Sequence, residues 1–386
     1  MARKYSCGFE LQTITNAVEV VSTTGSPTID TSIKRSGAAS MRFNATIAEV
    51  SARITEDPGA AADQIMRAYF YFASFPLATL TKIIQLSDSG GDHTSIRVNS
   101  DGTLELWNDV GAVQLGSDSA ALSLNTWYRI ELASGTTHTG DDVIARIDGV
   151  DFASSTTHSA GANWRYFEVG VMGALAMDLY VDDIALNDTT GTAQTFWPGA
   201  GSIVHMHPDS AGDAAASAGT FADIDEITPD DATTIIVIDE TTDIGDYNLE
   251  TSANAGIGAS DTITLVQVGI RFAGLSAATH THVTRIKSQA SGTVVSGTTT
   301  TGALSTYSTN DDTASARFYK LTSYVDPQAG GVWTPSLLDS AQIGVTSTDA
   351  NPDVNVSTLW ALVEYVPGVA GGTTITPRRM MLGVGT

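Results

Sequence analysis

The amino-acid sequence predicts an all-β protein with two sandwich domains, and three observations support that prediction. Apolar residues alternate with polar ones over short runs, as half-buried strands require, whereas helical periodicity is nearly absent. These runs follow one another at a spacing of roughly ten residues, which is typical of a β-sandwich. Hydrophobic residues make up 42% of the chain and charged residues only 16%, which favours strands with uncharged polar faces. The length of 386 residues allows two or three domains.

The first half has its most regular strands between Leu122 and Asn187. There, Tyr128, Ile130 and Leu132 fall on one face of a strand, and the residues between them fall on the other. The dipeptide Asp148-Gly149 separates two further alternating runs. A type I′ turn needs positive φ at both central positions, and Asp-Gly tolerates it, so these runs are predicted to form a hairpin.

Two earlier segments extend the pattern. The strand expected at Arg67–Phe75 is so rich in aromatic residues that both of its faces are expected to be covered. Ser100-Asp101-Gly102 joins apolar runs at Thr94–Asn99 and Thr103–Trp107, and it predicts a second hairpin.

Four segments of this half resemble a known family. They are Lys34–Phe43, NTWYRIEL at 125–132, ARIDG at 145–149 and VDDIAL at 181–186. In this order they resemble the laminin-G/concanavalin-A-like jelly roll, over residues 1–192. The resemblance implies two packed antiparallel sheets and a role in binding, and it implies nothing about catalysis. It also implies calcium as the ion, for which the loop acids of Asp88–Asp92 and Asp141-Asp142 are candidate ligands.

A domain boundary is expected at residues 193–201, because this linker ends in proline and glycines. Its Trp197 is expected to pack between the domains. A second β-sandwich is predicted for residues 202–367, followed by a C-terminal arm at 368–386. The strands expected in it are Ser202–His207, Thr234–Asp239, Thr262–Phe272, Thr281–Lys287, Gly292–Val295, Ala316–Val325 and Thr358–Val366.

Two phrases of the second half resemble wording that recurs in structural proteins of tailed bacteriophages. They are FADIDEITPDD at 221–231 and VDPQAGGVWT at 325–334, the second interpreted as a turn that leads into an edge strand. The resemblance implies a non-enzymatic virion protein that decorates the capsid or forms a head or tail fibre or appendage. Its implied partners are other virion proteins and further copies of itself, because many uncharged strands offer edges to neighbours.

Two other functions stay open. The alternative is a lectin-like module that attaches to a host-surface glycan, with Trp107, Trp127 and Trp164 as candidate stacking residues, although strand positions favour the core. The other is a glycosidase or depolymerase, which needs a carboxylate pair on one strand face.

No such carboxylate pair is recognisable. The nearest string, Asp223–Glu226, runs into Thr-Pro-Asp-Asp and is better interpreted as a turn, and Asp182-Asp183 is expected to be an ordinary exposed pair. The motifs G-x-S-x-G, G-x-x-x-x-G-K-[ST] and H-E-x-x-H are absent. The chain is therefore not expected to be an enzyme.

The charge and the single cysteine exclude several other classes. A net charge of −24 and a pI near 4.3 argue against a nucleic-acid ligand, which needs clustered lysine and arginine. Cys7 alone allows no intrachain disulfide and no thiolate metal cage. No apolar run is long enough for a membrane span or a signal peptide. Synthesis in a host cytoplasm, no membrane insertion and a final location in the virion are expected.

Histidine is the one residue type whose spacing suggests a site. His205 and His207 form one H-x-H pair, and His280 and His282 form another. Residues i and i+2 of a strand share a face, so each pair offers two imidazoles to one Zn²⁺ or Fe²⁺. The two pairs together make a candidate four-nitrogen site, or one pair repeats around a threefold axis. Surface or hydrogen-bonded histidines are the alternative, and beyond these ions and calcium no cofactor is expected.

Overall fold

The fold comes from a computed structural model, which describes residues 3–14, 18–56, 63–78, 80–88, 91–135, 143–156, 164–173, 175–239, 243–274, 280–302, 306–310, 318–347 and 354–368. Strands make up 52% of the structure and helices 2%, so the all-β prediction is confirmed. Among these residues no helix has the length and apolar character to cross a bilayer. The expected arm lies outside the described residues except for Gly368.

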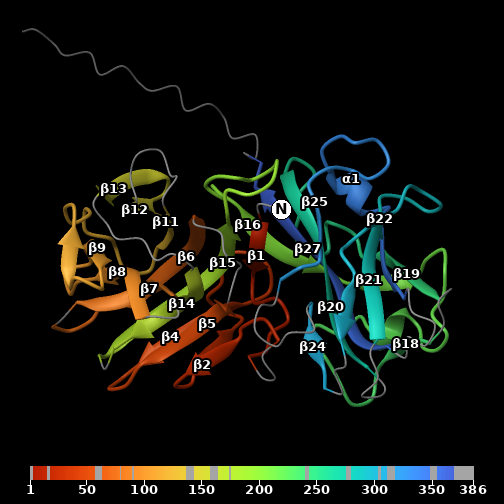
Figure 1. Cartoon of the computed structure of the whole chain (residues 1–386), viewed down its shortest axis with the longest axis horizontal. Coiled ribbons are helices and arrows are strands. Elements are labelled where there is room, and N and C mark those ends of the chain that lie inside the picture. The colour runs from red at the N-terminus through yellow and green to blue at the C-terminus, as the bar shows by residue number, and fades with distance from the viewer. Residues whose placement is uncertain are drawn as a thin grey trace, which may run out of the picture.

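Two antiparallel sheets form the N-terminal sandwich, over residues 3–187 (Figure 1). As described, sheet A runs β13 (Val150–Ser155), β12 (Val143–Ile147), β11 (Trp127–Ser134), β6 (Gln64–Ser74), β15 (Met177–Asn187), β4 (Ser40–Ala45) and β3 (Thr28–Asp30), with β1 (Arg3–Cys7) also paired to β15. Sheet B runs β10 (Val113–Leu115), β9 (Leu104–Asn108), β8 (Gly91–Val98), β7 (Thr81–Asp88), β14 (Trp164–Met172), β5 (Val50–Glu56) and β2 (Ser22–Thr24).

Both predicted hairpins of this half are confirmed. Asp148 and Gly149 have φ of 52° and 87°, and they connect β12 to β13 as a type I′ turn requires. In the other hairpin, Ile96 of β8 lies opposite Leu106 of β9.

The predicted faces of β11 are also confirmed. Ile130 and Leu132 are fully buried in the core between sheets A and B, and Tyr128 packs against that core. The intervening residues face away from the core, and the functional features described below lie on this outer face of sheet A.

Two further antiparallel sheets form the C-terminal sandwich, over residues 202–366 (Figure 1). As described, sheet C runs β16 (Ser202–Met206), β27 (Val354–Val366), β20 (Thr262–Gly274) and β24 (Ser308–Thr309), with β18 (Ile236–Ile238) on β27 and β25 (Leu321–Ser323) on β20. Sheet D runs β17 (Pro208–Ala211), β19 (Ile244–Leu249), β26 (Gln342–Thr346), β21 (His280–Lys287) and β22 (Val295–Ser296), with β23 (Thr300–Gly302) on β21. Helical segments in the described part of the chain are η2 (Phe221–Asp223) and α1 (Pro335–Leu338).

Two expectations for this half are wrong. Of the strand expected at Gly292–Val295, only Val295 lies in a strand, β22. The phrase at 325–334 was expected to lead into an edge strand, but it leads into helix α1. The hydroxyl of Thr334 accepts a hydrogen bond from the Leu337 amide, and Pro335 occupies the first helical turn. Both features favour a helix start: the Thr334 hydroxyl serves an amide that would otherwise have no partner, and Pro335 has no amide hydrogen to satisfy and a fixed φ that suits the first turn.

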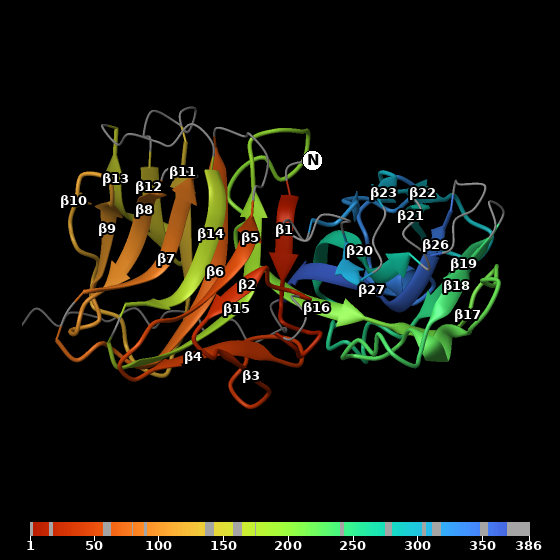
Figure 2. The same cartoon turned by 60° about the horizontal axis from the view of Figure 1, so that its bottom comes forward.

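Buried side chains join the two sandwiches. A cluster of apolar residues from both sides lies at the joint: Leu11, Val18, Ile203, Leu265, Tyr319, Trp360 and Leu362. Beside it, the Glu364 carboxylate of β27 contacts Arg3 of β1 at 2.8 Å and Arg67 of β6 at 2.6 Å. These three side chains are at most 1% exposed. Figure 2 shows β1 lying between the rest of the N-terminal sandwich and β27.

Candidate functional site

The four predicted histidines lie in two separate pairs. His205 lies on β16 in sheet C and His207 directly follows it, whereas His280 and His282 lie on β21 in sheet D. Within the pairs the ring centroids are 6.2 and 6.0 Å apart. In the part of the chain that the structure describes, no three histidine, cysteine, aspartate or glutamate side chains group to hold a metal ion. The two pairs therefore do not form a joint four-nitrogen site, and binding of Zn²⁺ or Fe²⁺ by one pair stays a prediction.

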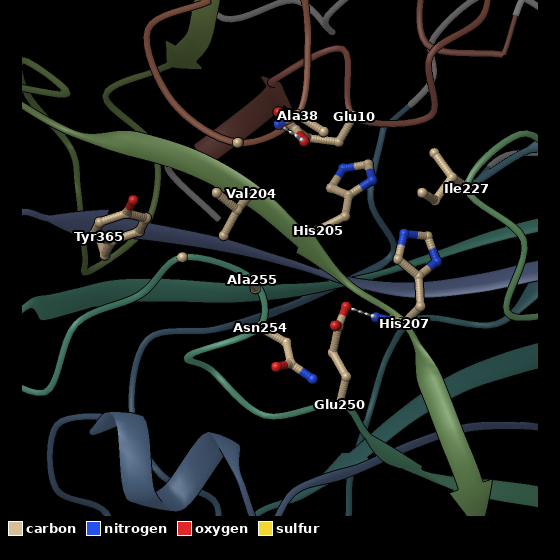
Figure 3. Close-up of a pocket in the computed structure, with 12 residues that line it drawn as sticks. Glu10, Ala38, Val204, His205, His207, Ile227, Glu250, Asn254, Ala255 and Tyr365 are labelled. Atoms are coloured by element: carbon tan, nitrogen blue, oxygen red, sulfur yellow. Dashed lines mark hydrogen bonds between the residues drawn. The ribbon is translucent and has the colours of Figure 1, made fainter. Parts of the chain in front are cut away.

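His205 and His207 line a cavity of about 320 Å³ between the two sandwiches (Figure 3). The N-terminal sandwich contributes Glu10, which lies across from His205 in the close-up, and the C-terminal sandwich contributes Glu250 below the histidines. The cavity thus combines two imidazoles and two carboxyl groups, drawn from both halves of the chain.

Burial sets the charge state of the histidines. It lowers the pKa of His205 well below its ordinary value, with a smaller effect in the same direction from His207, and it lowers the pKa of His207 to about 4. Both rings are therefore neutral at pH 7. The His205 ring stacks on Trp360, with centroids 5.5 Å apart, and neither of its nitrogens has a hydrogen-bond partner among the described residues.

Glu10 is held by backbone at one oxygen only. Its Oε2 accepts a hydrogen bond from the Ala38 amide at 2.7 Å, while Oε1 has no partner within the described ranges. Burial raises the pKa of Glu10 well above its ordinary value, and Glu19 and Asp183 act in the same direction. Burial also raises the pKa of Glu250, whose carboxylate accepts from the His207 amide at 3.1 Å.

The loop that holds Glu10 depends on a glycine. Gly37 has a φ of +57°, and a β-carbon there would overlap the Glu10 carboxyl group. We expect Gly37→Ala to lower the free energy of unfolding by about 2–4 kcal/mol in urea denaturation, from left-handed strain plus overlap. Gly330→Ala is the matched control, because Gly330 has a φ of +69° but nothing within 4 Å of the added carbon, so it reports strain alone. Equal losses in the two variants would contradict the overlap.

A second feature is a row of aromatic side chains on the outer face of sheet A. Trp127 of β11, Tyr71 of β6 and Tyr180 of β15 are cross-strand neighbours. The ring centroids are 5.4 Å apart for Trp127 and Tyr71 and 5.6 Å apart for Tyr71 and Tyr180. Tyr180 is buried, whereas Tyr71 and Trp127 are half-buried. We call these three residues the aromatic row.

The interpretation of Trp127 as a core residue is therefore wrong, because it points away from the core, and Trp107 is likewise half-buried. For Trp164 the structure describes the strand but not the side chain.

Polar groups flank the aromatic row. The Arg42 guanidinium lies 5.4 Å from the Tyr180 ring centroid and forms two hydrogen bonds to the Asp178 carboxylate, at 2.9 and 2.7 Å. At the other end, the Tyr71 hydroxyl donates to Asn125 Oδ1 at 3.1 Å, on the exposed surface. The row thus offers half-open rings with hydrogen-bonding groups at both ends.

The linker covers another part of the same sheet face. The Gly199 carbonyl accepts a hydrogen bond from Arg67, and the Gly201 amide donates to the Tyr69 hydroxyl. The guanidinium of Arg146 on β12 lies 3.9 Å from the Trp197 ring centroid. Tyr69 is buried while Tyr71, two positions along the same strand, stays half-open. The prediction that both faces of this strand are covered therefore holds at Tyr69 and holds only partly at Tyr71.

Two of the acidic residues considered from sequence, Asp183 and Asp223, have structural roles. Asp223 accepts hydrogen bonds from the Thr220 amide and hydroxyl at the start of η2, which agrees with its interpretation as a turn. The expectation that Asp182-Asp183 is exposed is wrong, because both are fully buried. Asp183 forms an ion pair with Arg35 and accepts from the Ile203 amide at 2.6 Å, so it links the two sandwiches. Its φ of +49° belongs to an irregularity in β15 that the sequence did not signal.

The calcium prediction cannot be followed through the structure. Residues 89–90 and 141–142 lie outside the described residues. Calcium binding by these loops stays a prediction.

Comparison with known proteins gives only partial likenesses. No family model matches the chain, and no curated protein sequence matches it. The cellulose-induced protein Cip1 is 17% identical with a TM-score of 0.38, over 50% of this chain and 99% of that one. A second structure is domain 4 of AbnA, a GH43 extracellular arabinanase from Geobacillus stearothermophilus, in complex with arabinotriose. It is 15% identical with a TM-score of 0.35, over 49% of this chain and 94% of that one. Trypanosoma rangeli sialidase in complex with sialic acid is 12% identical with a TM-score of 0.33, over 44% of this chain and 30% of that one. Likenesses at this level assign no function.

Proposed function

We propose that the protein is a non-enzymatic binding protein that holds a glycan across the aromatic row. The observation that carries the proposal is the pair of half-buried rings, Tyr71 and Trp127, side by side on an open sheet face. A sugar ring has apolar C–H faces that pack on aromatic rings and hydroxyls that need hydrogen bonds. Asn125 and the Arg42–Asp178 pair offer such bonds at the two ends.

The absence of catalysis is part of the proposal. Glycoside hydrolysis needs two carboxyl groups facing the same bond, one of them able to donate a proton. Asp178, the acid described beside the row, accepts two hydrogen bonds from the Arg42 guanidinium. A glycan on the row is therefore expected to be bound and released unchanged.

Glycan-array binding followed by titration of the best ligand tests the proposal. We expect Tyr71→Ala and Trp127→Ala each to weaken binding at least about tenfold, because aromatic anchors dominate such contacts. Trp107→Ala is the matched control: Trp107 is also half-buried and has Arg97 over its ring, but it lies on sheet B. It is expected to change affinity less than about twofold. No binding to any glycan, or equal losses in all three variants, would refute the proposal.

A second candidate is a structural component of a tailed-phage virion, which would assemble with other virion proteins and with copies of itself. The resemblance of the phrases at 221–231 and 325–334 to such proteins supports it. Mass spectrometry of purified particles tests it, and absence of the protein from them would reject it. The two candidates are compatible, since a virion protein that binds a surface glycan satisfies both.

A further inference from the structure

The interdomain cavity contains polar atoms that need partners. Within the described residues, Glu10 Oε1, both ring nitrogens of His205 and Nδ1 of His207 make no hydrogen bond. All three side chains line the cavity, and those of Glu10 and His205 are 5% and 6% exposed. A buried polar atom that makes no hydrogen bond destabilises the folded protein. An occupant that satisfies several of these atoms at once would therefore recover a large free energy.

The chemistry of the wall limits what the occupant is. A neutral imidazole offers one donor and one acceptor, and a protonated carboxyl group offers the same. An anion is disfavoured because no lysine or arginine is among the described residues that line the cavity, and an apolar molecule would leave the polar atoms without partners. A metal ion is disfavoured because no three ligating side chains group in the described part of the chain. What remains is an uncharged molecule that both donates and accepts hydrogen bonds.

We infer that this cavity is a binding site for a small neutral polyhydroxylated molecule, a monosaccharide or a sugar alcohol. Its volume of about 320 Å³ lies at the small end of the range of roughly 300–1,000 Å³ for ligand pockets. The His205 ring, which stacks on Trp360 behind it, forms one side, and Asn254 adds an amide. This site is distinct from the aromatic row and does not depend on it.

Calorimetric titration of the full-length protein at pH 7 tests the inference, with D-glucose, D-galactose, D-mannose, glycerol and sorbitol as separate probes. We expect at least one of them to bind saturably, with a Kd of about 1 mM or tighter. His205→Phe keeps a ring on Trp360 but removes both nitrogens, and it is expected to weaken binding at least about tenfold. His282→Phe replaces another buried histidine, in the other pair, and is expected to leave affinity within about twofold.

Variants at Glu10 test the neutral character of the site. Glu10→Gln keeps one donor and one acceptor, so affinity is expected to stay within about threefold, whereas Glu10→Ala is expected to lose at least about tenfold. If His205→Phe does not fold, the wild-type protein with 15N-labelled histidine gives the same answer, because the probe is expected to shift the ring signals. No saturable binding by any probe, leaving ordered water as the occupant, overturns the inference, and so does binding that His205→Phe leaves unchanged. Tyr71→Ala is expected to leave this titration unchanged, which separates the cavity from the aromatic row.

Discussion

Glu364→Gln is expected to lower the free energy of unfolding by about 3–5 kcal/mol. The substitution keeps the shape of the side chain but leaves the guanidinium groups of Arg3 and Arg67 buried without a counter-charge, and breaking a buried ion pair in this way costs about that much. Burial by itself would raise the pKa of Glu364, yet the two arginines outweigh burial and hold it below its ordinary value. Guanidinium denaturation of the purified variant measures the loss.

The control for this prediction is an ion pair nearer the surface. Glu168 contacts Arg53 at 3.1 Å, and their side chains are 20% and 31% exposed. Glu168→Gln is expected to cost less than about 1 kcal/mol, because water solvates both charges. A loss at Glu364 no larger than at Glu168 would mean that the buried triad contributes little to the joint. Replacing Glu364, Arg3 and Arg67 together by apolar residues is expected to restore most of the stability.

Glu19 is expected to make stability fall as the pH rises from about 4.5 to about 8. The lowered pKa values of His205 and His207 act in the opposite direction over the lower part of this interval. Burial raises the pKa of Glu19 to about 8, against opposing hydrogen bonds that include one from the Leu11 amide. A carboxyl group whose pKa is higher in the folded state binds its proton more tightly there, so its contribution is complete below the unfolded pKa and disappears through the folded pKa. The difference between the folded and unfolded pKa values of Glu19 corresponds to roughly 3–5 kcal/mol of stability over this interval.

Urea denaturation at pH 5.5 and at pH 8.5 measures the effect. Glu19→Gln is expected to reduce the difference between the two pH values, whereas Glu168→Gln leaves it unchanged. Glu10 and Asp182 also have raised pKa values from burial, so some pH dependence of the same sign persists in the variant. Tyr5, Cys7 and Tyr319 are the other titratable groups around Glu19. A difference that is the same in the wild type and in Glu19→Gln would exclude Glu19 as its source.

The parts of the fold that sequence predicts are those governed by local rules. The Asp148-Gly149 hairpin follows from backbone conformation, and the faces of β11 follow from alternation. The strands missed in the second half, β17, β19, β23, β24 and β26, are short and have polar or glycine positions that weaken alternation. Tertiary pairing rather than local preference makes them strands.

The candidate site depends on contacts between distant segments, which alternation cannot reveal. The spacing of His205 and His207 correctly indicates one shared face, but which residues lie opposite depends on how the sandwiches join. Glu10 belongs to a loop of the other sandwich and carries no motif. Asp183 looks like an exposed strand residue in the sequence and is buried because the backbone turns there and the start of β16 covers it. The aromatic row is hidden in the sequence for a related reason, since the linker covers one part of the sheet face and leaves the next part open.

The triad of Arg3, Arg67 and Glu364 also bears on the order in which the parts of the protein fold during synthesis. Arg3 and Arg67 are synthesised before their shared carboxylate, which lies on β27, and β27 follows nearly all the rest of the described chain. Until then the nascent N-terminal sandwich has two arginines that lack their final counter-charge and an apolar joint open to water. Contacts of such sequence separation form slowly. We therefore expect the joint to form only once β27 is in place, and a chain truncated before β27 to leave the first sandwich prone to aggregation.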